Sequence, residues 1–382
     1  MNQIKNWKLK ELPLTVDVET KAVLKSLPSA HAALAELKGI ASTIPNQIIL
    51  INTLGLQEAK DSSAIENIIT THDELYKSEL KLETFKSPEA KEVQNYISAL
   101  KKGFELIKAK GIITNNIIIE IQKELEGNSA GFRKLPGTAL KNLSTEETIY
   151  TPPQDIHEIN KLMANLEKFM NDPSMCDCDP IIKMAIIHYQ FESIHPFYDG
   201  NGRTGRIINI LYLIIEKLQN LPILYLSNYI IQNKSDYYRL LQQLRENENW
   251  EEWLLFMIHG IEKTARETID LIIQIRELML EYKHILRDNY KFYSQDLLNN
   301  LFKHPYTKID FIVNDLNVSR ITAAKYLNKL AEDGILRKEK IGTGSQLFYL
   351  ILVSVCGRMG SLNFFPILKS IFISVVNLFD WG

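Results

Sequence analysis

Hydrophobic residues recur every three or four positions along most of this chain, which is the spacing of amphipathic helices. Proline, glycine and polar clusters separate the stretches that have this spacing. The stretches lie at residues 20–40, 47–58, 90–107, 115–125, 155–171, 179–194, 207–215, 250–258 and 262–284. The pattern therefore predicts a mainly α-helical fold.

Residues 290–350 have a different pattern. Three short helices are predicted at residues 297–302, 309–316 and 320–331, and Ser319 can cap the third one. Two strands, at 335–341 and 346–350, flank the turn Gly342-Thr343-Gly344-Ser345. This order predicts a winged helix-turn-helix. Its third helix and wing are basic and could bind DNA, through Arg320, Lys325, Lys329, Arg337, Lys338 and Lys340. A packing or dimer domain is an equally good interpretation.

Composition limits the class of protein. The chain has 382 residues, 45% of them hydrophobic and 24% charged, which is typical of a soluble globular protein with two or three domains. Its net charge of −2 argues against a chain built mainly to neutralise nucleic acid. Three cysteines give no disulfide framework, and Cys176 and Cys178 are too few for a zinc site, so we expect a reduced, cytoplasmic chain. Residues 1–12 lack the apolar core of a signal peptide.

Residues 351–382 are apolar and poor in charge, unlike the rest of the chain. Pro366, Lys369 and Asn377 interrupt the segment, which argues against a membrane-spanning helix. A membrane contact, a core-capping element and an aberrant extension stay open; we favour the last two and expect no membrane partner.

The residues from His195 to Arg206 combine an imidazole, a carboxylate, small turn-forming residues and two guanidinium groups. The Gly-Asn-Gly at 200–202 can direct successive N–H groups into one concavity, immediately before an apolar helical run. A helix N-terminus at this point favours phosphate oxygens. Arg203 and Arg206 are three residues apart, so they share a helix face and both could reach a polyphosphate. The stretch therefore predicts a phosphate site.

Two other side chains of this stretch suggest chemistry at that site. Asp199 is poorly placed beside phosphate unless a cation intervenes, and Mg²⁺ is commonly held by one or two carboxylates and phosphate oxygens. A neutral His195 beside a triphosphate can act as general base for an incoming hydroxyl. The sequence contains no G-x-x-x-x-G-K-[ST]. Residues 200–205 fit G-x-G-x-x-G, but they follow a predicted helix, whereas the dinucleotide-binding motif follows a strand, so the two commonest nucleotide folds are not indicated. Phosphoryl or nucleotidyl transfer is the predicted reaction type.

The same stretch resembles the H-P-F-x-[D/E]-G-N-G-R-x-x-R signature of the Fic family, protein adenylyltransferases that move AMP from ATP to a hydroxyl side chain. Every signature position is filled. The resemblance implies that His195 is the base, that Asp199 binds Mg²⁺ and that Arg206 grips the γ-phosphate. The ATP-binding residues that it implies are Glu66, Gly200, Asn201, Gly202, Arg203, Thr204, Gly205, Arg206, Tyr237 and Tyr238.

A second motif precedes this core. Ser62, Glu66 and Asn67 match the [S/T]-x-x-x-E-[G/N] inhibitory motif of many Fic proteins. From the residues alone, the segment also fits a helix capped by Asp61 or Ser62, with Glu66 in solvent. In the family the glutamate pairs with the second signature arginine, here Arg206, and blocks productive seating of the γ-phosphate. A carboxylate on that guanidinium competes with phosphate for the same donors.

The resemblance also extends to the target site. Gly131-Phe132-Arg133 is similar to the element before the flap of Fic proteins, and residues 136–153 fit the flap itself. We expect Ile149, Tyr150 and Thr151 to form a strand edge that holds a target segment by main-chain pairing; a plain hairpin fits these residues equally well. In the family a tyrosine of a pair such as Tyr237 and Tyr238 lies by the adenine, and the alternative is an aromatic pair on a core helix.

Together these patterns predict a mainly α fold: a Fic helical core with a short β-hairpin flap, an N-terminal helical region and a C-terminal winged helix-turn-helix. The predicted parts are residues 1–89 with the inhibitory motif, 90–260 as Fic core, 261–289 as linker helix, 290–350 as winged helix and 351–382 as apolar tail. A homodimer is a further possibility.

The predicted function is AMP transfer from ATP to a Ser, Thr or Tyr hydroxyl of a target protein or of the chain itself, autoinhibited by Glu66. Resemblance also allows the reverse reaction, in which Glu66 orients the water that removes AMP. One alternative is a relative that transfers another phosphate-containing group, such as phosphate or phosphocholine. The other is a DNA-binding regulator whose Fic core senses nucleotide.

Overall fold

The structure is a computed structural model that describes residues 8–71, 74–75, 87–141, 146–303, 306–340 and 347–351, with only the main chain of 339–340 and 347–351. The expectations for the turn at 342–345 and for the tail at 352–382 lie outside the described residues, as do those for residues 1–7 and for 142–145 of the predicted flap.

The described chain divides into two compact units. The first lies within Met1–Lys38, Gln57–Ile68 and Glu92–Thr268, and the second within Gly39–Leu56, Ile69–Lys91 and Ile269–Gly382. The first unit contains all the residues predicted to bind nucleotide, and the second contains the predicted winged helix.

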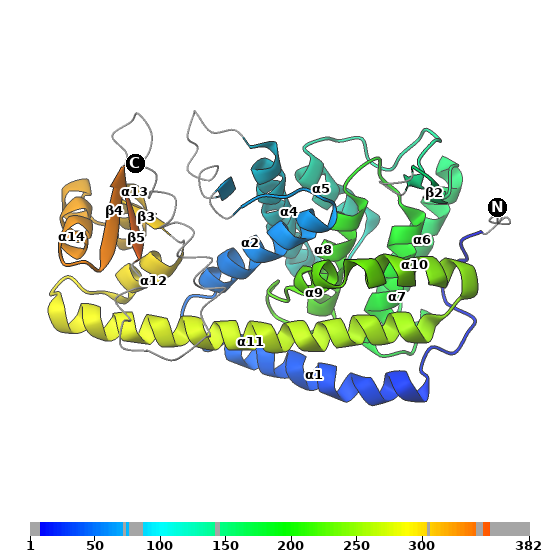
Figure 1. Cartoon of the computed structure of the whole chain (residues 1–382), viewed down its shortest axis with the longest axis horizontal. Coiled ribbons are helices and arrows are strands. Elements are labelled where there is room, and N and C mark those ends of the chain that lie inside the picture. Colours follow the sequence, from blue (N-terminus) through cyan, green and yellow to red (C-terminus); the bar gives the residue numbers. More distant parts are fainter. Residues whose placement is uncertain are drawn as a thin grey trace. The chain divides into compact units, whose positions relative to one another are not determined.

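Most of the predicted helices are present in the structure (Figure 1). Thr114 and Asp155 cap α5 and α6 with their side chains, which accept hydrogen bonds from first-turn N–H groups as expected for N-caps. Along the chain, the helices before the predicted winged helix are α1 (Lys21–Ala41), α2 (Ile48–Ile65), α4 (Pro88–Lys110), α5 (Asn115–Glu126), α6 (Ile156–Asn171), η1 (Pro173–Met175), α7 (Pro180–Ile194), α8 (Asn201–Ile215), α9 (Leu226–Gln232), α10 (Lys234–Asn247) and α11 (Trp250–Asn289).

Helices α7 and α8 form the centre of the first unit, where they pack along each other (Figure 1). Every residue of α7 from Ile181 to Ile194 is buried, and so are most residues of α8. A helix buried on all sides must carry few uncompensated polar groups. The short turn between α7 and α8 is therefore held at both ends by buried helices.

Two helices run further than the sequence pattern predicts. α2 continues to Ile65, because Ser62 and Ser63 are fully buried and belong to its last turn instead of starting a new helix. The predicted helices at 250–258 and 262–284 are one helix, α11. Gly260 lies between them and does not break the helix. Its lack of a side chain lets Tyr229 of α9 pack close to α11, since a Cβ there would lie 2.5 Å from Cδ1 of Tyr229.

The predicted flap is a two-stranded antiparallel sheet of β1 (Leu140–Lys141) and β2 (Thr148–Tyr150), in which Leu140 lies opposite Tyr150. Together with the helical core this confirms the predicted fold class. No helix among the described residues is long and apolar enough to cross a membrane.

The second unit contains a helix-turn-helix and a small sheet. Asn317 adopts left-handed backbone angles at the end of α13, and the Ser319 hydroxyl caps α14. The sequence pattern missed the first strand, β3, which pairs with β5 so that the sheet order is β3-β5-β4. A three-residue strand is too short to show a periodic pattern. The elements are α12 (Gln295–Lys303), β3 (Tyr306–Lys308), α13 (Ile309–Leu316), α14 (Arg320–Glu332), β4 (Leu336–Lys340) and β5 (Leu347–Ile351).

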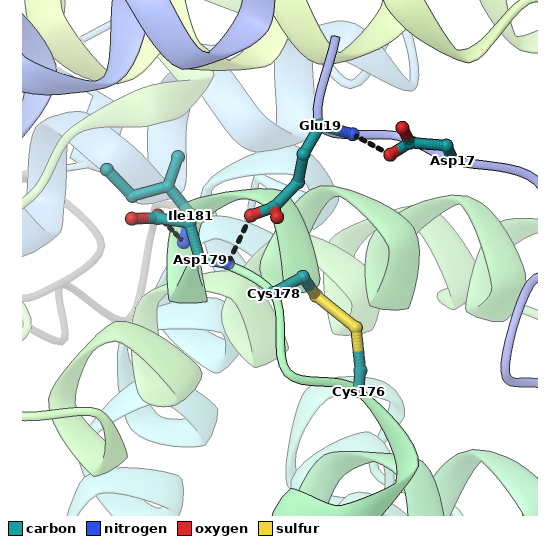
Figure 2. The surroundings of a disulfide bond; sticks show 6 residues. All are labelled: Asp17, Glu19, Cys176, Cys178, Asp179 and Ile181. Atoms are coloured by element: carbon teal, nitrogen blue, oxygen red, sulfur yellow. Dashed lines mark hydrogen bonds between the residues drawn. A yellow bond between two sulfur atoms is a disulfide. The ribbon is translucent and has the colours of Figure 1, made fainter.

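The expectation that the cysteines are reduced is wrong in this structure. Cys176 and Cys178 form a disulfide bond in the segment between η1 and α7 (Figure 2). The local turn brings their Cα atoms to 5.4 Å, within the usual range for a disulfide, and sequence spacing alone does not show such a turn. The side chain of the next residue, Asp179, caps α7 by accepting from the N–H of Ile181 at 2.8 Å, and the Asp179 N–H donates to the Glu19 carboxylate at 3.3 Å. The disulfide therefore lies directly before the start of α7.

Candidate active site

The turn between α7 and α8 has a tightly defined backbone. His195 ends α7 with left-handed backbone angles, and its N–H donates to the carbonyl of Phe191 at 2.9 Å. The Asn201 side chain closes the turn by accepting from the N–H of Phe197 at 2.8 Å and donating to its carbonyl at 2.9 Å. Asn201 is therefore a structural residue of the turn.

Two glycines make room at the N-terminus of α8. Gly200 has a φ of 76°, and a Cβ there would lie 2.4 Å from Oε1 of Glu126. A Cβ on Gly202 would lie 2.1 Å from Oε1 of Glu66. The backbone of this turn can thus be approached closely only because both residues lack a side chain.

His195 is in a state that can accept a proton. Burial is the main cause that lowers the pKa of its imidazole to about 4; the Glu66 carboxylate opposes this shift, and the cationic Arg133 and Arg245 add to it. The imidazole is therefore neutral at pH 7. Its main-chain carbonyl accepts a hydrogen bond of 2.9 Å from Nε of Arg133.

Arg206 is buried, with 3% of its surface exposed, and its guanidinium donates three hydrogen bonds to residues at the end of α2. It donates from Nε to the Ser62 hydroxyl at 2.7 Å, and from one terminal nitrogen to the Ser62 carbonyl at 2.9 Å and to Oε1 of Glu66 at 2.8 Å. We call these three bonds the Arg206 contact. Burial by itself would raise the pKa of Glu66, but the charge and the hydrogen bond of Arg206, together with the charge of Arg203, outweigh burial, and the pKa is lowered. Glu66 is therefore ionised at neutral pH.

Asn67 follows this contact with left-handed backbone angles, and its side-chain oxygen accepts a hydrogen bond of 2.8 Å from Lys234. The residues of the second motif thus lie together in the first unit, next to the N-terminus of α8. Glu66 is not a solvated helix residue, which was the alternative interpretation of the sequence.

Arg203 differs from Arg206 although both lie on α8. Its guanidinium donates to Glu92 of α4 at 2.8 Å and to Glu126 of α5 at 2.9 Å, and its exposure is 3%. Asp199 is further away, 3.9 Å from the guanidinium, and 79% of its side chain is exposed. Arg203 is therefore already neutralised by two carboxylates, whereas the Asp199 carboxylate faces solvent at the edge of the turn.

The flap is attached to the His195 turn at two points. The Tyr150 hydroxyl donates to the carbonyl of Ser193 at 2.6 Å, and the guanidinium of Arg245 lies 3.9 Å from the centre of the Tyr150 ring. Arg133 donates to the carbonyl of His195 and also to that of Pro153, at the end of the flap. Ile149 and Thr151, on either side of Tyr150, are exposed.

The two adjacent tyrosines, which the sequence does not distinguish, have different surroundings in the structure. Tyr237 is 1% exposed, and its hydroxyl bonds to Nε2 of His188 at 2.8 Å inside the core. Tyr238 is 46% exposed, and its ring packs on that of Tyr237. Partial burial and the Glu66 carboxylate raise the pKa of the Tyr238 hydroxyl. The charges of Glu66 and Arg206 act on both tyrosines, but Tyr237 is a core residue and only Tyr238 of the two is exposed.

Sequence reasoning missed several polar residues around the site. Glu58 could have been found, because Glu58, Ser62 and Glu66 are four residues apart and so share a helix face. For Glu92, Glu126 and Arg245 we find no such signal. Their importance depends on contacts between distant parts of the chain.

The helical core with its short flap, the basic turn at a helix N-terminus and the carboxylate on the buried arginine agree with the Fic resemblance of the sequence. Three family models match successive segments: "Fic/DOC family N-terminal" at residues 24–105, "Fic/DOC family" at 112–213 and "Protein adenylyltransferase SoFic-like, C-terminal domain" at 278–350. The chain belongs to the Fic/DOC family.

Among curated relatives, "Protein adenylyltransferase fic-1" of Caenorhabditis briggsae is 31% identical over 126 residues, 32% of this chain and 22% of that protein. "Protein adenylyltransferase Fic" of Drosophila erecta is 30% identical over 112 residues, 29% of this chain and 20% of that protein. The aligned region thus spans less than a quarter of either relative.

Among solved structures, a Fic family protein from Desulfovibrio desulfuricans G20 matches with a TM-score of 0.57 at 20% identity, over 89% of this chain and 98% of that one. This likeness supports the fold. The five-part division of the chain predicted from the sequence stays a prediction.

Proposed function

We propose that this chain is a protein adenylyltransferase that transfers AMP from ATP to a hydroxyl side chain of a protein, and that Glu66 holds it in an inhibited state. The observation that carries the proposal is the Arg206 contact. A buried guanidinium beside a glycine-lined helix N-terminus is a strong phosphate ligand, and here a carboxylate of the same chain takes the place of phosphate.

In the proposed reaction the triphosphate of ATP lies over the N-terminus of α8, with Arg206 on the γ-phosphate. His195 takes the proton of the target hydroxyl, and the hydroxyl oxygen attacks the α-phosphorus. The bond between the α-phosphorus and the bridging oxygen breaks, and pyrophosphate leaves. The exposed edge of β2 would present the target hydroxyl by main-chain pairing, with Ile149 and Thr151 beside it.

Mg²⁺ fits the residues at this turn. Asp199 offers an exposed carboxylate at the edge of the proposed phosphate site. The described residues contain no group of three or more His, Cys, Asp or Glu side chains that could hold a metal ion. An ion bound by Asp199 would therefore take most of its ligands from phosphate and water, as Mg²⁺ commonly does. When bound, it neutralises phosphate charge.

Labelled ATP tests the proposed reaction directly. Incubation with ATP labelled at the α-phosphate is expected to give covalent label on the chain or on lysate proteins, whereas ATP labelled at the γ-phosphate gives none. Label from the γ-position alone would indicate phosphate transfer. Release of AMP from a protein already labelled would indicate the reverse reaction, and no label in any variant would favour the nucleotide-sensing regulator.

Replacing Asp199 with alanine is expected to reduce labelling about a hundredfold in a Glu66→Gly background, because charge stabilisation by the ion would be lost. The dependence on Mg²⁺ concentration should disappear with it. Glu120→Ala removes an exposed carboxylate of α5 and serves as control. Full activity of the Asp199 variant with unchanged Mg²⁺ dependence would exclude Asp199 as the ligand.

DNA binding by the winged helix is a second proposal. Lys325 and Ile321 are exposed on α14, the helix that would enter the major groove. Two other cations of α14 already face carboxylates, since Arg320 pairs with Asp310 and Lys329 with Asp333. A mobility-shift assay at moderate salt should show binding that the double change Arg320→Ala and Lys325→Ala removes. Binding that survives both changes would show that α14 is not the reader.

A homodimer and a cytoplasmic location stay predictions from the sequence. So does the choice of the chain itself as a target, which the labelling experiment above would reveal.

A further inference from the structure

Glu58 is a buried carboxylate that the proposed reaction does not use. It lies on α2 with 3% of its surface exposed. Its Oε1 accepts hydrogen bonds from the hydroxyls of Tyr96, at 3.0 Å, and of Ser227, and its Oε2 accepts the main-chain N–H of Ser227 at 3.0 Å. One carboxylate thus joins α2 to α4 and to the first turn of α9.

The position of Glu58 on α2 connects this junction with the Arg206 contact. Glu58, Ser62 and Glu66 follow each other at intervals of four residues, so they lie along one side of the last turns of α2. Ser62 and Glu66 supply all three acceptors of the Arg206 contact. Glu58 holds the preceding turn of the same helix, which sets where those acceptors lie.

Burying a carboxylate to join α2 to α4 and α9 costs desolvation free energy. Burial raises the pKa of Glu58 to about 7 against the effect of its hydrogen bonds. Burying such a group is unfavourable unless its hydrogen bonds are made, and removing them leaves buried donors without acceptors. An apolar residue would hold α2 with a smaller loss of desolvation free energy. It would not, however, fix the rotation of α2 or its position along the helix axis relative to Ser227.

We propose that Glu58 is a positioning residue for autoinhibition: by fixing the last turns of α2 against α4 and α9, it holds Ser62 and Glu66 on Arg206. This inference rests on the proposed function. It predicts that loosening the Glu58 junction increases adenylyl transfer, because Arg206 then becomes available to the γ-phosphate. A merely structural Glu58 would have the opposite effect, since damage to the core lowers activity.

Glu58→Gln is the first test variant. The amide keeps the shape of the side chain, but with its oxygen on the Ser227 N–H, its NH₂ group faces the hydroxyls of Tyr96 and Ser227, which must turn from donors into acceptors. We expect labelling from α-labelled ATP to rise about tenfold over the wild type, which corresponds to the weakening of two buried hydrogen bonds to a charged group. In a Glu66→Gly background the same change should add less than about twofold, because the two changes act through one contact.

Ser227→Ala is a milder second variant that removes only one hydroxyl, and it should increase labelling about threefold. Asn228→Ala is its matched control, because Asn228 is the next residue of α9 but bonds to Glu267 of α11 instead of α2. The control should label like the wild type. If Glu58→Gln and Ser227→Ala both label no more than the wild type while Glu66→Gly labels strongly, the role of Glu58 is refuted and the proposed function stands.

Hydrogen–deuterium exchange gives a readout that does not depend on activity. Exchange of residues 57–71 should be faster in Glu58→Gln than in the wild type, and unchanged in Asn228→Ala. If no variant labels, including Glu66→Gly, the proposed transferase function fails. Exchange then decides the positioning role alone: faster exchange supports it, and unchanged exchange overturns it.

Discussion

Replacing Glu66 with glycine is expected to raise the covalent labelling of protein by α-labelled ATP at least about tenfold. The change removes one of the hydrogen bonds that engage Arg206, a charge-assisted bond of 2.8 Å. Such bonds contribute about 1.5–3 kcal/mol, and each 1.4 kcal/mol corresponds to a factor of ten. The γ-phosphate can then occupy the guanidinium, so that the gain appears mainly in turnover and less in ATP affinity.

Two further variants show whether the gain comes from this contact. Adding Arg206→Ala to Glu66→Gly should abolish it, because both changes act on one interaction. Glu66→Gln keeps the size of the side chain without its charge, and we expect labelling between that of the wild type and that of the glycine variant. Equal labelling of wild type and Glu66→Gly, on folded protein, would show that the Arg206 contact is structural and not inhibitory.

Replacing His195 with alanine in the Glu66→Gly background is expected to reduce AMP transfer about a hundredfold or more, the usual effect of losing a general base. Burial keeps this imidazole neutral at pH 7, so it can take the proton of the target hydroxyl. ATP affinity, measured by calorimetry, should change little, since the proposed phosphate ligands are the N-terminus of α8 and Arg206.

His157→Ala is the control for this prediction, because His157 is exposed on α6, outside the site. It should transfer AMP like its parent. Transfer at the parental rate by the His195 variant would mean that another group deprotonates the target. Lost ATP affinity would mean that His195 binds the nucleotide instead.

Local patterns in the sequence predicted the central part of the site. The run that forms α7, the proline after it and the glycines before α8 specify a helix, a turn and a helix within about forty residues, so no distant contact is needed to interpret them. The same holds for Ser319 at the start of α14. These features depend on neighbouring residues, which a single sequence displays.

Features that depend on distant residues were not predictable in this way. The bond between Glu58 and Ser227 joins residues 169 positions apart, and the carboxylates on Arg203 come from 77 and 111 positions away. Tyr237 and Tyr238 are chemically alike and adjacent, yet a rotation of one residue along α10 buries the first and exposes the second. The contacts of Tyr237 with His188 of α7 and with Trp253 of α11 distinguish them.

The double attachment of Arg133 has a consequence for how targets could change during evolution. One guanidinium holds the carbonyls of both His195 and Pro153, so the flap and the turn that carries the base share a fixed reference point. Side chains on the exposed face of β2 can therefore vary without displacing the imidazole. In the proposed reaction, target preference and proton transfer would therefore be separable traits: the residues that recognise a target could change while His195 stays in place, as long as Arg133 and the end of the flap are kept.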